Sequence, residues 1–246
     1  MSEAGAPRSA DRRSAEIVSG LAAVRTRIAD ACARAGRDPQ AVTIVAVTKT
    51  YPADDVLTLA DLGVQDIGEN RDHEAAAKSA EVAQRRPELR LRWHFVGQVQ
   101  TRKARSIARY AHSVHAVDRP ELVAELAAAV DRVDRAALEV FVQVSLDGDP
   151  HRGGAPPDAV AALTDAVAAQ SALVLRGVMA VAPLGADPES AFGRLAEIAA
   201  EVRRAHPGAD AISAGMSSDL AEALRHGSTH VRVGSALLGP RGPVFG

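Results

Sequence analysis

The stretch Val42-Thr-Ile-Val-Ala-Val-Thr48, which runs directly into Lys49, decides the fold class of this chain. Its apolar residues are continuous and mostly β-branched, and Pro39 and Pro52 bound it. A strand with one exposed face would alternate apolar and polar residues, so this pattern indicates a strand buried on both faces. Such strands are typical of parallel sheets with helices on both faces. The stretch therefore predicts an α/β fold.

An amphipathic helix is predicted before this strand, over residues 14–35, and Gly36 is well placed to end it. Its apolar positions recur every three or four residues, at Ile17, Leu21, Val24 and Ile28. Residues 1–13 mix both charges and lack the apolar core of a secretory signal, so we expect a frayed tail there. Residues 14–246 are expected to form a single domain.

The alternation of helix and strand continues to the end of the chain. The predicted strands are 42–48, 66–68, 91–97, 113–117, 138–145, 173–181, 211–213 and 229–234. The predicted helices between them are 53–62, 74–85, 102–110, 120–133, 157–169, 188–205 and 220–225. Eight strands joined by helical crossovers predict a closed parallel (β/α)₈ TIM barrel with one extra N-terminal helix. An open doubly wound sheet is the alternative.

Composition narrows the possible partners and compartments. The net charge is −2 and aromatic residues make up only 3%, so the chain offers neither a positive field nor stacking platforms for nucleic acid. Cys32 is the single cysteine and cannot form an internal disulfide, which indicates a reducing compartment. No apolar stretch approaches the roughly 20 residues that span a bilayer. We therefore expect a cytoplasmic protein without membrane or nucleic-acid partners.

Residues at the carboxyl ends of the strands are the first candidates for chemistry, because active sites of such barrels lie there. They are Lys49, Glu69, Asn70, His94, Gln98, Asp118, Arg152, Met179, Ser213, Arg232 and Ser235. The amine of Lys49 would be partly withdrawn from water, and such an amine can attack a carbonyl and form a Schiff base. Alternatively, Lys49 extends into solvent or pairs with a carboxylate such as Glu69. Sequence position alone leaves both interpretations open.

Two small-residue turns favour an anionic ligand. Residues 212–224 are predicted to form a strand, a turn rich in Ser and Gly, and a capped helix. Val233-Gly-Ser-Ala236 follows the last strand with a similar turn. Backbone N–H groups of such turns bind phosphate, and the loops after strands seven and eight are the usual phosphate site of this barrel. Either turn alone is more simply an ordinary cap, but together they predict a phosphorylated ligand.

Among the inward-facing polar residues, Arg232 alternates with valines and needs an acceptor, which is a carboxylate or a ligand nitrogen. His94 also alternates with apolar neighbours and is interpreted as a hydrogen-bonded core residue. His112 and His115, which we place on a strand edge, lack a third ligand, so no metal site is predicted.

These motifs match, in order, those of a known family. They are Val45-Ala-Val-Thr-Lys-Thr50, Ile67-Gly-Glu-Asn70, Trp93-His-Phe-Val-Gly-Gln98, Gly177-Val-Met179, Ser213-Ala-Gly-Met-Ser217 and Gly227-Ser-Thr-His-Val-Arg-Val-Gly234. Over nearly its whole length the chain resembles the pyridoxal 5′-phosphate homeostasis proteins. Each motif is weak alone, but the set is highly specific.

The resemblance implies a fold-type III barrel, like the amino-terminal domain of alanine racemase, with pyridoxal 5′-phosphate (PLP) held by Lys49 as an internal aldimine. It further implies that Arg232 faces the pyridine nitrogen and that Asn70 lines the ring pocket. The residues that it places around the phosphate are Ser213, Met216, Ser217, Gly234 and Ser235.

Two positions depart from the family pattern. Arg152 stands where a lysine is usual after the fifth strand, and Tyr51 replaces a lysine often found two residues beyond the cofactor lysine. Because an arginine cannot form a Schiff base, cofactor transfer through position 152 is in doubt.

The first hypothesis is a non-catalytic carrier that buffers PLP and delivers it to PLP-dependent apo-enzymes. We also expect the protein to be a monomer. Alanine racemase takes a second acid/base from a separate carboxyl-terminal domain, and this chain ends at Gly246, so we expect one face of the ring to lack such a partner. The alternatives are a PLP-dependent amino-acid racemase, a Schiff-base aldolase, and a scaffold whose cofactor is incidental.

Overall fold

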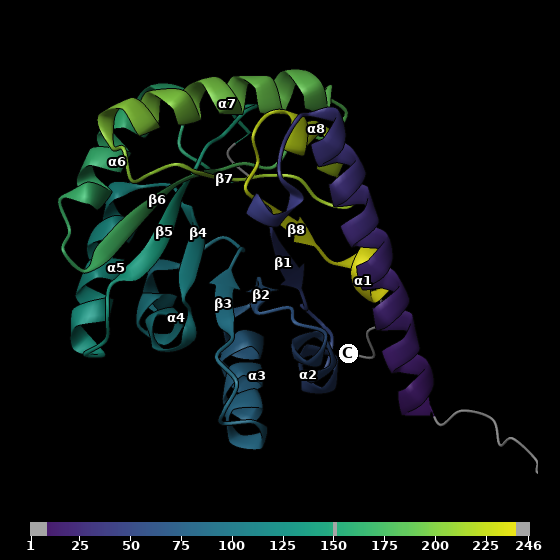
Figure 1. The fold of residues 1–246 in the computed structure, drawn as a ribbon. Coiled ribbons are helices and arrows are strands. Elements are labelled where there is room, and N and C mark those ends of the chain that lie inside the picture. The colour runs from purple at the N-terminus through teal and green to yellow at the C-terminus, as the bar shows by residue number, and fades with distance from the viewer. Residues whose placement is uncertain (1–8, 150–151, 240–246) are drawn as a thin grey trace, which may run out of the picture.

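Parallel strands close into a barrel in chain order, with β8 hydrogen-bonded back to β1 (Figure 1). The computed structural model describes residues 9–149 and 152–239. Within them the strands are β1 (Thr43–Val47), β2 (Asp66–Glu69), β3 (Arg92–Phe95), β4 (Ser113–Val117), β5 (Leu138–Gln143), β6 (Leu173–Met179), β7 (Ala211–Ser213) and β8 (His230–Val233). The predicted (β/α)₈ barrel is confirmed. The open doubly wound sheet is wrong, because consecutive strands pair in chain order and β8 pairs with β1, which leaves the sheet without an edge.

Helices surround the barrel and cover its outer face (Figure 1). They are α1 (Ser9–Arg34), α2 (Ala53–Asp61), α3 (Asp72–Arg85), α4 (Ala104–Tyr110), α5 (Pro120–Arg132), α6 (Val160–Ala168), α7 (Pro188–Ala205), α8 (Leu220–Arg225) and α9 (Ser235–Leu238). Short 3-10 turns are η1 (Pro39–Ala41), η2 (Thr101–Lys103) and η3 (Pro157–Ala159). Crossover helices are what parallel neighbours require, so the alternating sequence pattern and the topology agree.

The start of α1 differs from the prediction, which ended the tail at residue 13. The helix begins at Ser9, and residues 1–8 lie outside the described residues. Arg13 explains the earlier start, because its guanidinium binds the buried carboxylate of Asp55 at 2.6 Å and the carbonyl oxygen of Leu238 at 2.9 Å. These contacts hold the first turns of α1 against α2 and α9 where a free tail was expected.

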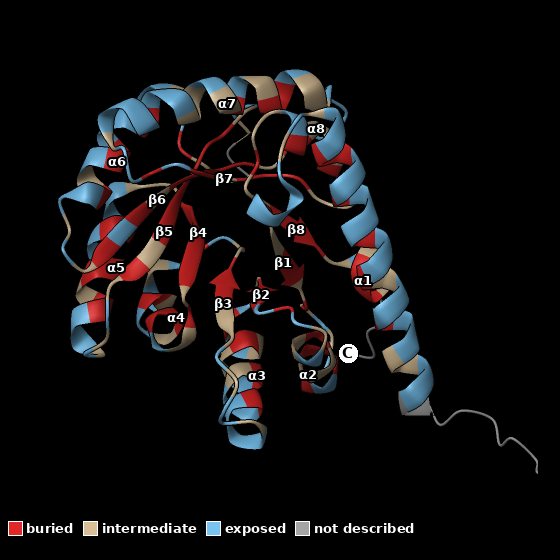
Figure 2. Cartoon of the chain, viewed as in Figure 1, coloured by how far each residue is buried: buried red, intermediate tan, exposed pale blue. Residues whose placement is uncertain are grey.

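The buried residues form an apolar layer outside the barrel and a mixed apolar and polar layer inside it. The outer layer packs strands against helices, which show buried inner and exposed outer stripes (Figure 2). Inside, a small apolar cluster of Ala116, Phe141, Met179 and Ala211 accompanies buried polar groups. These are His94, His115, Ser213 and Arg232. These buried polar side chains lie inside the barrel, below the candidate site at the carboxyl ends of the strands.

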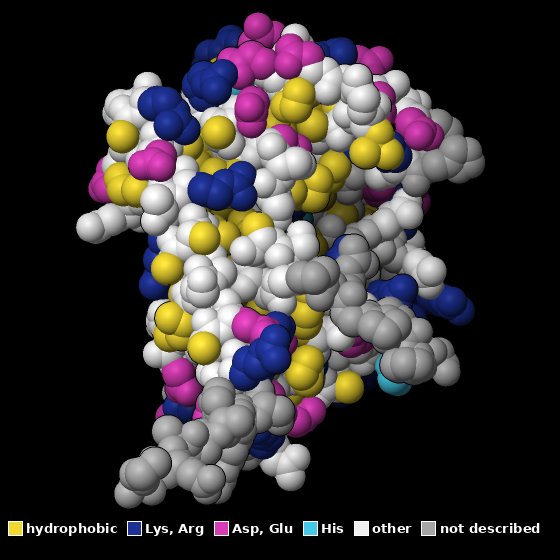
Figure 3. All heavy atoms as spheres, turned by 90° about the vertical axis from the view of Figure 1, so that its right-hand side faces the viewer, with side chains coloured by type: hydrophobic (Ala, Val, Ile, Leu, Met, Phe, Trp, Pro, Cys, Tyr) yellow, Lys and Arg dark blue, Asp and Glu magenta, His cyan; other side chains and the backbone are white. Residues whose placement is uncertain are grey.

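On the face shown in Figure 3, Lys and Arg side chains lie scattered among Asp and Glu side chains and apolar areas. This agrees with the nearly balanced charge of the chain. Within the described ranges, no helix is both long and apolar enough to cross a membrane.

Candidate functional site

Lys49 lies two residues beyond the end of β1 and is half-buried at the carboxyl end of the barrel. The next residue, Thr50, has a φ of 69°, in the left-handed region. For a β-branched residue this conformation costs about 1–3 kcal/mol, and such strain persists where the surroundings enforce it, commonly at functional sites. The backbone around Lys49 is therefore held in one conformation.

Buried polar contacts fix the residue before Lys49. The Thr48 hydroxyl donates to Glu69 Oε1 at 2.6 Å, and Lys78 donates to the Thr48 carbonyl oxygen at 2.8 Å. Lys78 Nζ also lies 2.6 Å from Glu69 Oε1, and both side chains are buried. Burial raises the pKa of Glu69 although Lys78 opposes this shift. β2 and α3 thus brace the turn that carries Lys49.

Glu74 on α3 completes this support from the other side of Lys49. Its carboxylate accepts a hydrogen bond from the Thr50 backbone N–H and lies 3.1 Å from Lys78 Nζ. We did not single out Lys78 from the sequence. The available signal was its position on α3, where it shares the buried stripe with Ala75 and Val82.

Asn70 follows β2 and carries a buried acceptor without a partner. Its Oδ1 has no hydrogen bond among the described residues, and neither does Glu69 Oε2. Gly97 makes room for this arrangement, because a Cβ on Gly97 would stand 2.4 Å from the Asn70 carbonyl oxygen. An unpaired buried acceptor is costly in a folded protein, so a ligand donor at this position would satisfy it.

The two small-residue turns meet beside the strand of Lys49. Ser217 Oγ accepts a hydrogen bond from the Ala236 N–H at 3.4 Å, which places the loop after β7 next to the loop after β8. Gly234 lies against β1, since a Cβ on it would stand 3.3 Å from the Val47 carbonyl oxygen. The two loops that the sequence predicts to lie side by side therefore meet next to β1. That Ser217, Gly234 and Ser235 surround a phosphate stays a prediction. The N–H of Met216 is bonded to Asp219 at 2.6 Å in this arrangement.

Ser213, which the resemblance places near the phosphate, lies at the end of β7 with its side chain inside the barrel. Its side chain is fully buried and lies 2.7 Å from Arg232 Nη1 and 2.9 Å from His115 Nδ1. The alternation along β7 turns it into the barrel, so its hydroxyl is engaged there and bears on the site through Arg232.

Arg232 points into the barrel, as predicted, and binds oxygens of two neighbouring strand ends. Nη1 donates to Ser213 O at 2.7 Å, and Nη2 donates to Ala180 O at 2.8 Å. Burial lowers the pKa of Arg232 to about 10, which still leaves it charged at neutral pH. Within the described part of the chain, no carboxylate forms an ion pair with it at 4.0 Å or less.

His94 is a hydrogen-bonded core residue, as predicted. Its Nε2 lies 2.8 Å from Asp66 Oδ1, and its Nδ1 lies 2.9 Å from His115 Nε2. The expected strand-edge position of His115 is wrong, because a closed barrel has no edge and the residue is fully buried inside it. Among the described residues, no group of three or more His, Cys, Asp or Glu side chains is placed to hold a metal ion.

The two departures from the family pattern both have structural partners. Arg152 pairs with Asp147 at 2.7 Å and donates to Ala182 O at 2.8 Å, so it ties the loop after β5 to the loop after β6. Tyr51 donates its hydroxyl to Gly239 O at 2.7 Å. The neighbouring residues 150 and 151 lie outside the described ranges.

The structure thus combines a closed barrel, a lysine just after its first strand, and two small-residue loops beside that strand. Residues 20–242 match the family model of the alanine racemase N-terminal domain. The pyridoxal phosphate homeostasis protein of Mycobacterium tuberculosis is 44% identical over 243 residues, covering 93% of this chain and 94% of that protein. That of Mycobacterium leprae is 42% identical over 245 residues, with the same coverage of 93% and 94%. The chain belongs to the pyridoxal phosphate homeostasis protein family.

A solved structure supports the same family assignment. The structure of PipY from Synechococcus elongatus PCC7942 with PLP bound is similar to the structure of this chain, with a TM-score of 0.78 and 30% sequence identity. The match covers 91% of this chain and 100% of that one.

Proposed function

We propose that this protein binds PLP as a reversible internal aldimine on Lys49 and buffers intracellular PLP without turning over a substrate. The observation that carries this proposal is the enforced geometry at Lys49. Contacts from β2 and α3 hold Thr48 and Thr50, and Thr50 keeps a strained conformation. A preorganised amine at the mouth of a barrel is suited to capturing an aldehyde.

The surrounding residues fit the rest of the ligand. The unpaired Asn70 Oδ1 lies on the loop next to Lys49 and would line the ring pocket. The joined loops of Ser217, Gly234 and Ser235, with Met216, would hold the phosphate. Arg232 would face the pyridine nitrogen. When bound, PLP supplies the aldehyde and an electron-accepting ring.

Arg232 is also the residue that favours a carrier over an enzyme. A guanidinium stays protonated and offers only donors, so a pyridine nitrogen opposite it accepts a hydrogen bond and remains unprotonated. An unprotonated ring withdraws electrons weakly, which disfavours carbanion chemistry on a bound amino acid. The names of the relatives, which are homeostasis proteins, support the same interpretation.

The wider role follows as part of the proposal. We infer that PLP-dependent apo-enzymes receive the cofactor, that the protein acts as a monomer, and that it works in the cytoplasm. The single free cysteine, Cys32, is buried, in line with a reducing compartment. Size-exclusion chromatography with light scattering tests the monomer, and transfer of PLP to an apo-aminotransferase tests delivery.

The visible spectrum of the purified protein tests PLP binding. We expect a yellow Schiff-base band, fixed by borohydride onto the peptide that contains Lys49. Lys49→Ala should lose the band and the reducible adduct. The matched control Lys103→Ala, at a lysine whose side chain is 42% exposed and pairs with Asp72, should keep both. A wild-type protein that takes up no PLP, or an adduct on another lysine, contradicts the proposal.

Turnover is tested separately with the loaded protein. Incubation with L- and D-amino acids, followed by chiral chromatography, should show no sustained racemisation or deamination. An aldolase would instead purify colourless and give a borohydride adduct only with an added sugar phosphate. Sustained turnover in either assay would reject the carrier.

A further inference from the structure

A continuous chain of hydrogen bonds crosses the interior of the barrel below Arg232. It runs from Arg232 Nη1 to Ser213 Oγ at 2.7 Å, and from Ser213 Oγ to His115 Nδ1 at 2.9 Å. The next bond joins His115 Nε2 to His94 Nδ1 at 2.9 Å, and the last bond joins His94 Nε2 to Asp66 Oδ1 at 2.8 Å. The five residues come from β8, β7, β4, β3 and β2, and all are buried.

Donor and acceptor chemistry allows one simple direction for this chain. Asp66 is a carboxylate and accepts, so His94 carries its proton on Nε2 and its Nδ1 accepts. His115 must then donate from Nε2, which leaves its Nδ1 to accept the Ser213 hydroxyl proton. The Ser213 oxygen in turn accepts from Arg232. Every bond is satisfied with both histidines neutral.

The two ends of this series of hydrogen bonds carry opposite charges. Arg232 is a buried cation without an ion-pair partner among the described residues, a situation that is normally unfavourable. Asp66 at the far end is an anion. Burial would raise its pKa, but hydrogen bonds with His94 and Arg92 lower it to about 2. A row of aligned dipoles links the two charges through a low-dielectric interior.

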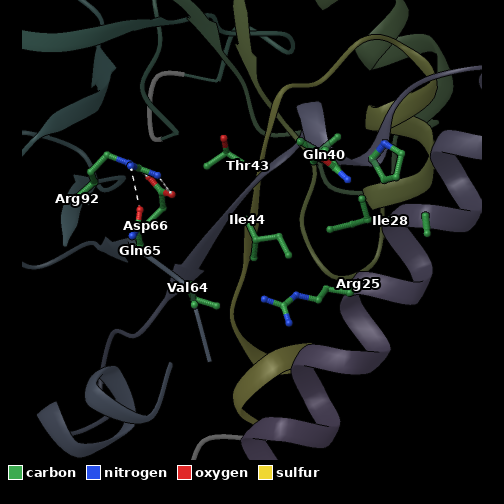
Figure 4. A pocket seen from close by; sticks show the side chains of 13 residues that line it. Arg25, Ile28, Gln40, Thr43, Ile44, Val64, Gln65, Asp66 and Arg92 are labelled. Atoms are coloured by element: carbon green, nitrogen blue, oxygen red, sulfur yellow. Dashed lines mark hydrogen bonds and ion pairs between the residues drawn. The ribbon is translucent and has the colours of Figure 1, made fainter. Parts of the chain in front are cut away.

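The anionic end reaches the opposite mouth of the barrel. Asp66 and Arg92 lie on the wall of a cavity of about 510 Å³ at the amino ends of the strands, beside Val64 and Ile44 (Figure 4). Arg92 binds Asp66 there through Nε at 2.7 Å. The chain therefore connects the amino end of the barrel to the residue that faces the proposed ligand.

We propose that His115 is a positioning residue, which orients the Ser213 hydroxyl as an acceptor and thereby holds the Arg232 guanidinium toward the pyridine nitrogen of PLP. This inference rests on the proposed function. His115 packs on Phe141 at a ring-centroid distance of 4.3 Å, and the charged or titratable groups that face it are His94, His230 and Arg232. Burial lowers its pKa well below the usual value, in agreement with a neutral ring.

Two substitutions at the same position separate hydrogen bonding from packing. His115→Phe keeps a ring against Phe141 but removes the acceptor for Ser213, whereas His115→Asn keeps an acceptor near the position of Nδ1. We expect the PLP dissociation constant to rise about tenfold in His115→Phe, with a shifted absorption maximum, and to return to within about threefold of wild type in His115→Asn. Ser213→Ala removes the same link from its other side and should resemble His115→Phe. His112→Gln is the matched control, because His112 pairs with Glu139 and takes no part in this series of hydrogen bonds.

Nuclear magnetic resonance of the ligand-free protein tests the chain independently of PLP binding. Nitrogen-15 spectra should show His94 and His115 both carrying a proton on Nε2, with the His115 ring neutral from pH 6 to 8 because burial lowers its pKa. Exchange of the Arg232 guanidinium protons with water should accelerate in His115→Phe and Ser213→Ala, but not in His115→Asn. Failure of PLP binding with these spectra intact would reject the proposed function alone. A His115 proton on Nδ1, or equal effects of Phe and Asn, would overturn the positioning role.

Discussion

Lys78 places a positive charge beneath the loop that carries Lys49, in a position where both of its main partners are also buried. Its ammonium joins the Glu69 carboxylate at 2.6 Å and the Thr48 carbonyl oxygen at 2.8 Å. Removing it with Lys78→Met leaves the Glu69 carboxylate buried and uncompensated. Breaking one partner of a buried pair typically costs about 3–5 kcal/mol, so we expect a loss of about 3 kcal/mol in the free energy of unfolding in urea.

The double variant Lys78→Met/Glu69→Gln is the matched comparison for this prediction. It removes both charges and keeps the oxygen that accepts from Thr48, so it should recover most of the lost stability. Equal losses in the single and double variants would show that the cost comes from packing and not from the unpaired charge.

At this scale the sequence predicted residues whose position in a strand sets their direction. Arg232 belongs to this group, because the period of two along a buried strand fixes where a side chain points. His115 and Lys78 were missed, since their roles depend on partners from other elements. The link from His115 to Ser213 spans 98 residues of sequence, and no local pattern encodes such a pairing.

Helix α1 shows how one contact extends an element beyond its apolar pattern. Its apolar stripe starts at Ile17, yet the helix starts at Ser9. The cause is Arg13, which binds Asp55 of α2 and the carbonyl oxygen of Leu238 in α9. The strands and crossover helices were predictable because their patterns are local, whereas this start depends on a long-range ion pair.

Substitution of Arg13 should therefore weaken the attachment of α1. Arg13→Ala leaves the Asp55 carboxylate, which is 4% exposed, without its guanidinium. Because Arg13 itself is 31% exposed, we expect a loss of about 2 kcal/mol in the free energy of unfolding, below the range for a fully buried pair. Arg12→Ala is the control, because the Arg12 side chain is 79% exposed and forms an ion pair with the exposed Glu16. This substitution should change the free energy of unfolding by less than about 0.5 kcal/mol. Amide hydrogen exchange should also quicken in residues 11–20 of Arg13→Ala alone.

Considered as a whole, the molecule combines an apolar shell with a barrel interior rich in polar groups. The shell explains why the fold class was predictable, because apolar periodicity reports where strands pack against helices. The interior explains why the site was predictable only in part. Lys49 and the two loops lie at the carboxyl end of the barrel, next to local sequence motifs. The series of buried hydrogen bonds from Asp66 to Arg232, by contrast, exists only once the barrel has closed.

Two histidines of the barrel, the buried His115 and the partly buried His230, predict how the stability of the whole protein depends on pH. Burial lowers the pKa of His230 to about 4, and that of His115 well below 6.5. Below pH 6.5 the unfolded chain therefore binds protons that the folded barrel excludes, so the free energy of unfolding falls with falling pH by about 1.4 kcal/mol per pH unit for each histidine. For His230 this loss is complete near pH 4. Above pH 6.5 neither group contributes a slope.

Urea unfolding at pH 7.5, 6.5, 5.5 and 4.5 measures this dependence, and His230→Asn isolates one histidine. The variant should unfold with a slope smaller by about 1.4 kcal/mol per pH unit between pH 6 and 4.5. The raised pKa of Glu69 acts with the opposite sign, because the folded state then holds the extra proton, but it cancels when the variant is compared with wild type. Asp66 titrates below this window, since its pKa is about 2. Equal slopes in both proteins would mean that His230 binds its proton in the folded barrel as readily as in the unfolded chain, and would contradict the lowered pKa.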